Sequence, residues 1–340
     1  MSRSSRSLPL SPALLGGAAV LAGGIAAFRA SPWPGSMLIR AVFAHNDRQI
    51  MQALQKHTPS TVTSFRDVAY LPGEPAARLD VFVPTSAFTR EETLPTVVWM
   101  PGGAWVAGSK DDWAPYFMVL AEQGFAVVGV EYTRAPGKVY PAALNQLEAA
   151  LSYVREHAGR FRLDPERIVL AGDSAGAQIV TQYVAGLDEP AYAARSGFAA
   201  TLPREVLQGL VLYCGIYDFD RYFGAPHIIG YGTRVATWAY TGNPATTMDD
   251  NPTLREMSTI QHASERFPPA FISCGNADPL TALQSKPFAE ALRSRGVPVT
   301  TLFFPEGHEP GLGHEYQFDL DGAAGQRALR ESVAFLREVI

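Results

Sequence analysis

The sequence has little of what marks several classes of protein. Lysine and arginine together number 28 against 33 acidic residues, and they are scattered, so we expect no nucleic-acid partner. No H-E-x-x-H or similar ligand cluster is present, so we expect neither a metal nor an organic cofactor. Cysteine occurs only twice, at Cys214 and Cys274, in apolar runs where a thiol usually behaves as a small buried side chain. Whether the two pair depends on geometry that sequence does not give.

The first 35 residues differ from the rest. Arg3 and Arg6 precede a charge-free apolar stretch at 12–28, which predicts a targeting segment. We favour an uncleaved membrane anchor over a removed signal peptide or a buried helix, with the main domain on the extracytoplasmic side. The cytoplasmic side stays open, because Arg29 and Arg40 balance the first two arginines. A breaker cluster at 31–35 then separates the segment 1–35 from a domain at 36–340.

The domain alternates predicted strands and helices. Two antiparallel strands are expected at 68–71 and 79–83. Continuous apolar runs predict strands buried on both faces at 96–100, 125–130, 168–171, 210–213, 270–273 and 299–304. Helical periodicity occurs at 113–123, 142–157, 175–187, 283–294 and 325–339. The pattern predicts an α/β fold with a mostly parallel, doubly wound sheet and helices on both faces. Short amphipathic helices near 37–57, within a segment 37–65, and a long insertion at 216–266 are expected to form a cap.

A nucleophile motif follows the strand at 168–171. The sequence Gly-Asp-Ser-Ala-Gly at 172–176 matches G-x-S-x-G between a strand and a helix, with Ser174 at its centre. Such a turn is sharp and strained, and glycines flank the serine because side chains would collide there. A phosphate-binding loop would instead have a lysine after its second glycine, where Ala177 stands.

Acyl transfer also needs backbone N–H groups that stabilise an oxyanion. One source is the N–H of Ala175, directly after the nucleophile. The other is the segment Met-Pro-Gly-Gly-Ala-Trp at 100–105, which follows the strand at 96–100. This segment offers the N–H groups of Gly103 and Ala104, with Gly102 in support.

The acid and the base are expected after the serine, in the order Asp or Glu, then His. Asp278 lies just past the strand at 270–273 and is the favoured acid, with Asp218 as the alternative. Only His308 and His314 follow Asp278, and spacing alone favours neither as the base.

These motifs resemble the hormone-sensitive-lipase-like esterases of the α/β-hydrolase superfamily. The resemblance runs from about residue 94 to the C-terminus and includes Asp-Pro-Glu-Arg-Ile at 164–168, Tyr-Thr-Arg-Ala-Pro at 132–136 and Asp-Pro-Leu at 278–280. It implies Ser174 as nucleophile, Asp278 as acid, and Gly103, Ala104 and Ala175 as oxyanion donors. The segment at 314–318 resembles the family's His-Gly-Phe, which favours His314 over His308, although Glu315 stands where the family has glycine.

The chain departs from the family twice more in the oxyanion loop. Pro101 replaces a histidine whose side chain would brace the loop, and Ala104 replaces the last glycine. The second change adds only a methyl group to a residue whose backbone is the donor.

The expected function is cleavage of carboxylic esters, small or lipid-like, through an acyl-enzyme on Ser174. An acyltransferase would use the same triad, and a catalytically inactive hydrolase fold would act as a binding protein. The sequence does not decide the acyl-chain length or the oligomeric state.

Overall fold

A computed structural model describes residues 24, 26–223, 227–245 and 247–340. Most of the expected anchor at 12–28 therefore lies outside the described residues. Within the part of the chain that is described, no helix is both long and apolar enough to cross a membrane.

The core of the molecule is an eight-stranded sheet in the order β1-β2-β4-β3-β5-β6-β7-β8. β2 pairs antiparallel with both β1 and β4, and the remaining neighbours pair in parallel. The strands are β1 (Val62–Ala69), β2 (Arg78–Pro84), β3 (Leu94–Met100), β4 (Ala126–Val130), β5 (Leu163–Asp173), β6 (Leu207–Tyr213), β7 (Ala270–Cys274) and β8 (Val299–Phe303). Every predicted strand overlaps one of these, although the strand expected at 68–71 shares only residues 68 and 69 with β1. The expected α/β-hydrolase fold is confirmed.

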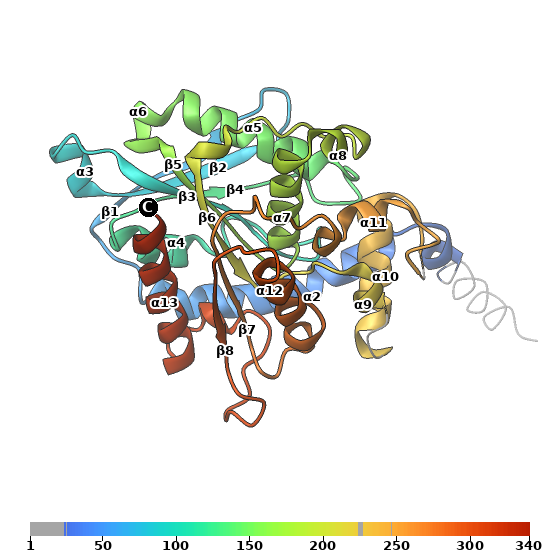
Figure 1. Cartoon of the computed structure of the whole chain (residues 1–340). Coiled ribbons are helices and arrows are strands. Elements are labelled where there is room, and N and C mark those ends of the chain that lie inside the picture. Colours follow the sequence, from blue (N-terminus) through green and yellow to red (C-terminus); the bar gives the residue numbers. More distant parts are fainter. Residues whose placement is uncertain (1–23, 25, 224–226, 246) are drawn as a thin grey trace, which may run out of the picture.

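Helices cover both faces of this sheet (Figure 1). On one face, α4 (Ala114–Glu122) and α13 (Ala323–Val339) contribute Phe117, Leu120 and Phe335 to a core with Trp99. On the other face lie α5 (Ala142–Glu156), α7 (Ser174–Asp188) and α12 (Lys286–Arg293), whose apolar side chains form a second core. Two faces covered by helices explain why the parallel strands are continuous apolar runs.

Further helices connect and cap these layers. They are α3 (Thr85–Thr89), α6 (Ala158–Phe161), α8 (Pro190–Arg195), α9 (Phe219–Phe223), α10 (His227–Thr241) and α11 (Thr253–Met257), with single turns η1 (Arg204–Val206), η2 (Thr259–Gln261), η3 (Thr281–Ser285) and η4 (Tyr316–Phe318). The insertion at 216–266 thus contains α9, α10, α11 and η2.

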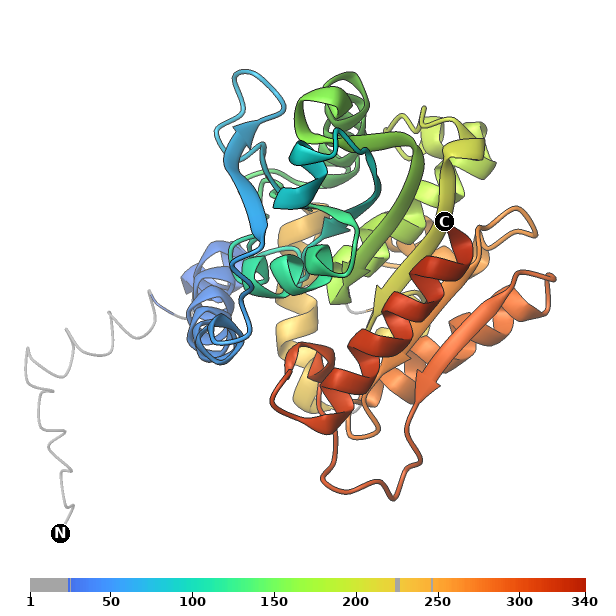
Figure 2. The same cartoon turned by 90° about the vertical axis from the view of Figure 1, so that its left-hand side faces the viewer.

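The region before the sheet differs from expectation. In place of several short helices there is one helix of 23 residues, α2 (Trp33–Gln55), seen beside α4 and the sheet in Figure 2. Pro34 lies in its first turn, where a proline needs no N–H partner, so the breaker cluster begins the helix. α2 packs on α10 closely enough that a Cβ on Gly35 would lie 2.7 Å from Val235 Cγ1.

Candidate active site

Ser174 lies at the turn between β5 and α7, at the carboxyl end of the parallel strands. Its backbone φ of 49° is in the left-handed region, which costs a non-glycine residue about 1 kcal/mol. The chain can turn this sharply because its flanks are small. A Cβ on Gly176 would lie 2.0 Å from Met100 O, and one on Gly172 would lie 2.6 Å from Gly176 C. The geometry therefore holds the Ser174 side chain clear of the sheet, as the motif predicts.

The structure brings Ser174, His314 and Asp278 together. His314 Nε2 lies 3.1 Å from Ser174 Oγ, and His314 Nδ1 lies 2.6 Å from Asp278 Oδ2. Asp278 is buried and also accepts the backbone N–H of Leu280 at 2.9 Å, whereas the His314 side chain is 37% exposed. A buried carboxylate that orients an accessible imidazole toward a hydroxyl is the arrangement needed to activate a serine.

Charges around the imidazole set its protonation. Burial tends to raise the pKa of Asp278, but its hydrogen bond to His314 outweighs this, so the pKa of Asp278 stays below its usual value. Burial disfavours imidazolium, yet Glu315 when ionised, the bond to Asp278 and the Cys214 thiol hold the pKa of His314 above its ordinary value. His314 is thus a stronger base than a free histidine.

The alternative base His308 and the alternative acid Asp218 make other contacts. The ring of His308 packs on Phe304, with ring centres 4.6 Å apart, and its backbone carbonyl accepts a hydrogen bond from Asn276. Asp218 Oδ2 lies 3.2 Å from Arg221 Nε, and Asp218 Oδ1 accepts the backbone N–H of Arg221 at the start of α9. Of the candidate acids and bases from sequence, Asp278 and His314 contact each other, and His314 contacts Ser174.

The expected oxyanion loop follows β3. Gly103 has φ 103° and Ala104 has φ 51°, and among the described residues no group accepts the backbone N–H of either. Ala104 thus occupies the left-handed region that the family's glycine would take freely, so its methyl group carries a conformational cost that its small size does not suggest. Ala175 lies directly after Ser174 in the first turn of α7.

Asp173 braces the loop in place of the histidine side chain that is missing because Pro101 stands at that position. Its side chain is fully buried; Oδ1 accepts the indole N–H of Trp99 at 2.7 Å and Oδ2 accepts the backbone N–H of Gly102 at 2.8 Å. Gly102 must lack a side chain, because a Cβ there would lie 2.4 Å from Asp173 Oδ2. The backbone N–H of Gly102 therefore already has an acceptor, Asp173, and Gly102 supports the loop.

Comparison with known proteins places this site in a family. The BD-FAE family model matches residues 79–292, which include Ser174 and Asp278. The chain belongs to the BD-FAE family. Its expected place among the esterase-like α/β-hydrolases is thereby confirmed.

Relatives of this BD-FAE chain carry esterase names. It is 27% identical to "Esterase LipQ" of Mycobacterium tuberculosis over 81% of this chain and 62% of the relative. It is 29% identical to "Probable carboxylic ester hydrolase LipM" of the same organism over 73% of this chain and 55% of the relative. The chain thus spans about three-fifths of the length of these two proteins. Esterase B from Lactobacillus rhamnosis shares the fold, with a TM-score of 0.77, 19% identity and coverage of 89% of this chain and 96% of that structure.

The sequence pattern did not place two cysteines beside the triad of this BD-FAE chain. Cys214 and Cys274 are buried and free, at the ends of neighbouring strands β6 and β7. Cys274 Sγ lies 3.2 Å from Asp278 Oδ2, and Cys214 Sγ accepts the backbone N–H of Glu315 at 3.3 Å. The signal in the sequence that could have placed them there is their position at the carboxyl ends of core strands. Potential metal-ligand atoms of Cys214, Asp278 and His314 lie within 4.8 Å of one another. Asp278 and His314 already use theirs in the triad, and Cys214 Sγ accepts the N–H of Glu315.

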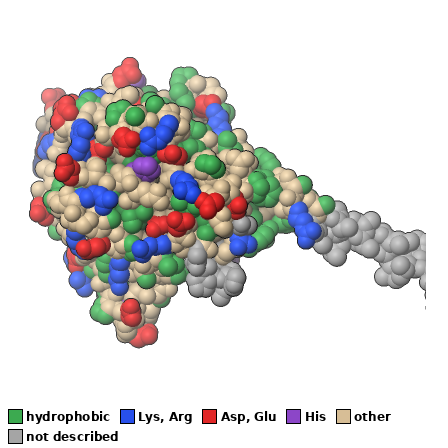
Figure 3. All heavy atoms as spheres, turned by 45° about the vertical axis from the view of Figure 1, so that its right-hand side comes forward, with side chains coloured by type: hydrophobic (Ala, Val, Ile, Leu, Met, Phe, Trp, Pro, Cys, Tyr) green, Lys and Arg blue, Asp and Glu red, His purple; other side chains and the backbone are tan. Residues whose placement is uncertain are grey.

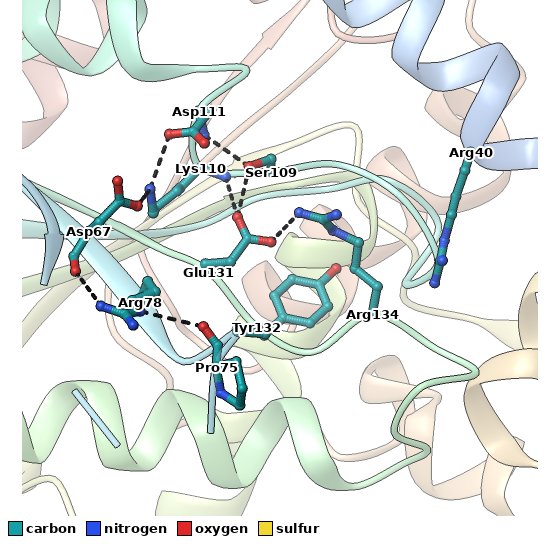
Figure 4. A pocket seen from close by; sticks show the side chains of 11 residues that line it. Arg40, Asp67, Pro75, Arg78, Ser109, Lys110, Asp111, Glu131, Tyr132 and Arg134 are labelled. Atoms are coloured by element: carbon teal, nitrogen blue, oxygen red, sulfur yellow. Dashed lines mark hydrogen bonds and ion pairs between the residues drawn. The ribbon is translucent and has the colours of Figure 1, made fainter. Parts of the chain in front are cut away.

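Figure 4 shows a polar cavity lined by charged side chains from several elements. It has a volume of ≈ 340 Å³, and its lining includes Arg40, Lys110, Glu131 and Arg134 but not the triad. Its charges pair with one another: Arg134 with Glu131, and Lys110 with the carboxylates around it. On the face shown in Figure 3, basic and acidic side chains are likewise intermixed, with no large surface of one sign.

Proposed function

We propose that this chain hydrolyses carboxylic esters, with Ser174 as nucleophile, His314 as general base and Asp278 as the residue that orients it. The observation that carries the proposal is the continuous line of contacts from Asp278 through His314 to Ser174, at 2.6 and 3.1 Å. The esterase names of LipQ and LipM support the same reaction class.

The reaction begins with neutral His314. Its Nδ1–H is donated to Asp278, which leaves the Nε2 lone pair to accept the proton of Ser174 as Oγ attacks the ester carbonyl. The negative charge that develops on the carbonyl oxygen is stabilised by the N–H groups of Gly103, Ala104 and Ala175, each worth about 3 kcal/mol in such sites. The imidazolium then protonates the departing alcohol, and an acyl-enzyme remains. Water, activated by the same histidine, releases the acid.

The test is hydrolysis of p-nitrophenyl esters from acetate to palmitate. We expect Ser174→Ala and His314→Ala to lose at least about 1,000-fold in kcat, as in other triads, and His308→Ala to stay within about threefold of wild type. Equal loss in both histidine variants would contradict the assignment of His314. Acyl transfer to an added alcohol that exceeds hydrolysis would favour a transferase, and full inertness of the wild type would favour a binding role.

We also propose that the N-terminal segment holds the enzyme at a membrane, where lipid-like esters reach it. The support is the first half of α2, where the apolar side chains of Trp33, Met37, Leu38 and Val42 are exposed, shortly after the apolar stretch 12–28. Flotation with phospholipid vesicles tests this. The full chain should float, a chain that begins at residue 31 should float less, and the Met37→Gln/Leu38→Gln/Val42→Ser form of that shorter chain should not float. Absence of the full chain from the vesicle fraction would contradict the proposal.

A further inference from the structure

Glu315 stands directly after the proposed base, in a conformation that suits it poorly. Its φ is 59°, in the left-handed region where glycine is at ease and glutamate is strained. The side chain is also buried, with only 9% of its surface exposed. A strained backbone and a buried carboxyl are both unfavourable, so the contacts of the carboxyl group are what can explain its presence.

The carboxyl of Glu315 faces two parts of the active site at once. Its Oε1 lies 3.5 Å from His314 Nε2, the same nitrogen that faces Ser174 Oγ. It also forms a side-chain hydrogen bond with Asp173, the residue that holds Gly102 in the oxyanion loop. Glu315 thus contacts both the base, His314, and the residue that braces the loop, Asp173.

Two hydrogen-bonded carboxyl groups cannot both be ionised at little cost, because a proton must lie between them. Asp173 already accepts N–H groups from Trp99 and Gly102, and both bonds favour its ionised form. The shared proton therefore belongs on Glu315. Burial and the neighbouring Asp173 agree with this, since both raise the pKa of Glu315 above its usual value.

We propose that Glu315 is a positioning residue that donates its proton to Asp173 and so links the base His314 to the oxyanion loop. The inference rests on the proposed triad. Below the transition of Glu315 the pair carries one negative charge, and the loop is held by three donors to Asp173. As the pH rises through that transition, a second negative charge appears beside His314 Nε2 and the oxyanion site. The loop then loses a donor, and the new charge opposes formation of the oxyanion.

Other groups that can titrate also face this pair. They are Asp47 of α2, Tyr132 after β4, Tyr213 and Cys214 at the end of β6, and Asp278 after β7. Of these, Asp47 is the buried carboxyl whose pKa, about 7, falls in the range to be scanned. Asp47→Asn is therefore the matched control, since it removes one buried carboxyl from the neighbourhood and leaves the Glu315–Asp173 pair intact.

The experiment measures kcat/KM against pH for wild type, Glu315→Gln, Glu315→Gly and Asp47→Asn. Glutamine keeps a donor to Asp173, so we expect kcat/KM within about threefold of wild type near neutral pH and no alkaline fall. Glycine relieves the backbone strain but removes the donor, so kcat/KM should fall about tenfold while Tm does not fall. Wild type and Asp47→Asn should both lose activity on the alkaline side. The proposal is overturned if Glu315→Gln keeps the alkaline fall of the wild type, or if Glu315→Gly is as active as the wild type.

A spectroscopic measurement separates this proposal from the proposed function. The wild-type infrared spectrum minus that of Glu315→Gln at neutral pH should show the band of a protonated carboxyl. The wild type minus Glu306→Gln, which alters an exposed glutamate, should show none. Presence of this band in a wild type that hydrolyses no ester would leave the carboxyl pair standing and refute the esterase. A wild type that is active and lacks the band would refute the pair alone.

Discussion

The indole N–H of Trp99 donates to Asp173 Oδ1 at 2.7 Å, and through Asp173 a residue of β3 supports the loop that follows its own strand. We expect Trp99→Phe to keep most of the ring packing and to leave a buried carboxylate oxygen without its donor. The free energy of unfolding should fall by about 2 kcal/mol, and kcat/KM should fall several-fold. Urea denaturation and ester kinetics measure the two effects. Trp113→Phe, which alters a ring stacked on Phe318, should lower stability without lowering kcat/KM.

A second contact ties the cap helix to the same loop. Arg40 of α2 donates from Nε to Val106 O at 2.7 Å and from Nη2 to Ala135 O at 2.9 Å. We expect Arg40→Ala to lower stability by about 2 kcal/mol and to raise KM, because α2 loses one charge-assisted bond to the end of the loop and another to the segment after β4. Arg48→Ala, at an exposed position on the same helix, should change neither. An unchanged KM in Arg40→Ala would show that α2 does not support the loop.

Asp47 predicts a pH dependence of stability. Burial, with Asp112 and Asp173 nearby, raises its pKa from 3.8 to about 7. A carboxyl whose pKa is higher in the folded state contributes stability that is present below the unfolded value and is lost as the pH rises toward 7. The free energy of unfolding of Asp47→Asn should therefore exceed that of wild type by about 2 kcal/mol at pH 8. At pH 4 the two values should differ little. Asp249→Asn, at an exposed site, should show no such pH-dependent gain.

Lys110 is a nearly fully buried lysine whose Nζ lies 3.0 Å from Asp80 Oδ1, and Asp80 is fully buried as well. Lys110→Met should cost about 3 kcal/mol of unfolding free energy, because it removes the buried one of the two cations that neutralise the Asp80 carboxylate. The double variant Lys110→Met/Asp80→Asn should recover much of this loss. If the single variant were as stable as wild type in urea, Arg66, 2.8 Å from Asp80 on its other side, would be the sufficient partner.

Local pattern was enough to predict the sheet and the nucleophile. Continuous apolar runs define β3 to β7 because both faces of the sheet are covered there, and the glycines at 172 and 176 are required by close approach to neighbouring backbone. β8, also expected to be buried on both faces, is an edge strand whose side chains are mostly half-buried or exposed. The helices of the cap were less predictable. α2 is one long helix because its buried positions pack on α10, a partner almost 200 residues away that periodicity over a short window does not see.

The contacts around the triad could not be predicted from the local sequence pattern for the same reason. Asp173 is part of the G-x-S-x-G motif, but its role depends on Trp99 and Gly102 of another strand and loop. Glu315 in place of a glycine counted against His314 in the sequence. In the fold, its left-handed φ explains the family's glycine, and its contact with His314 explains what a carboxyl can do there.

The most direct test of the account is covalent labelling of the full chain with a fluorophosphonate, followed by peptide mass mapping. The account predicts one label per chain, on Ser174, formed more slowly in His314→Ala and absent in Ser174→Ala. A label on another residue, or an unlabelled wild type with native Tm, would contradict the claim that Ser174 is an activated nucleophile.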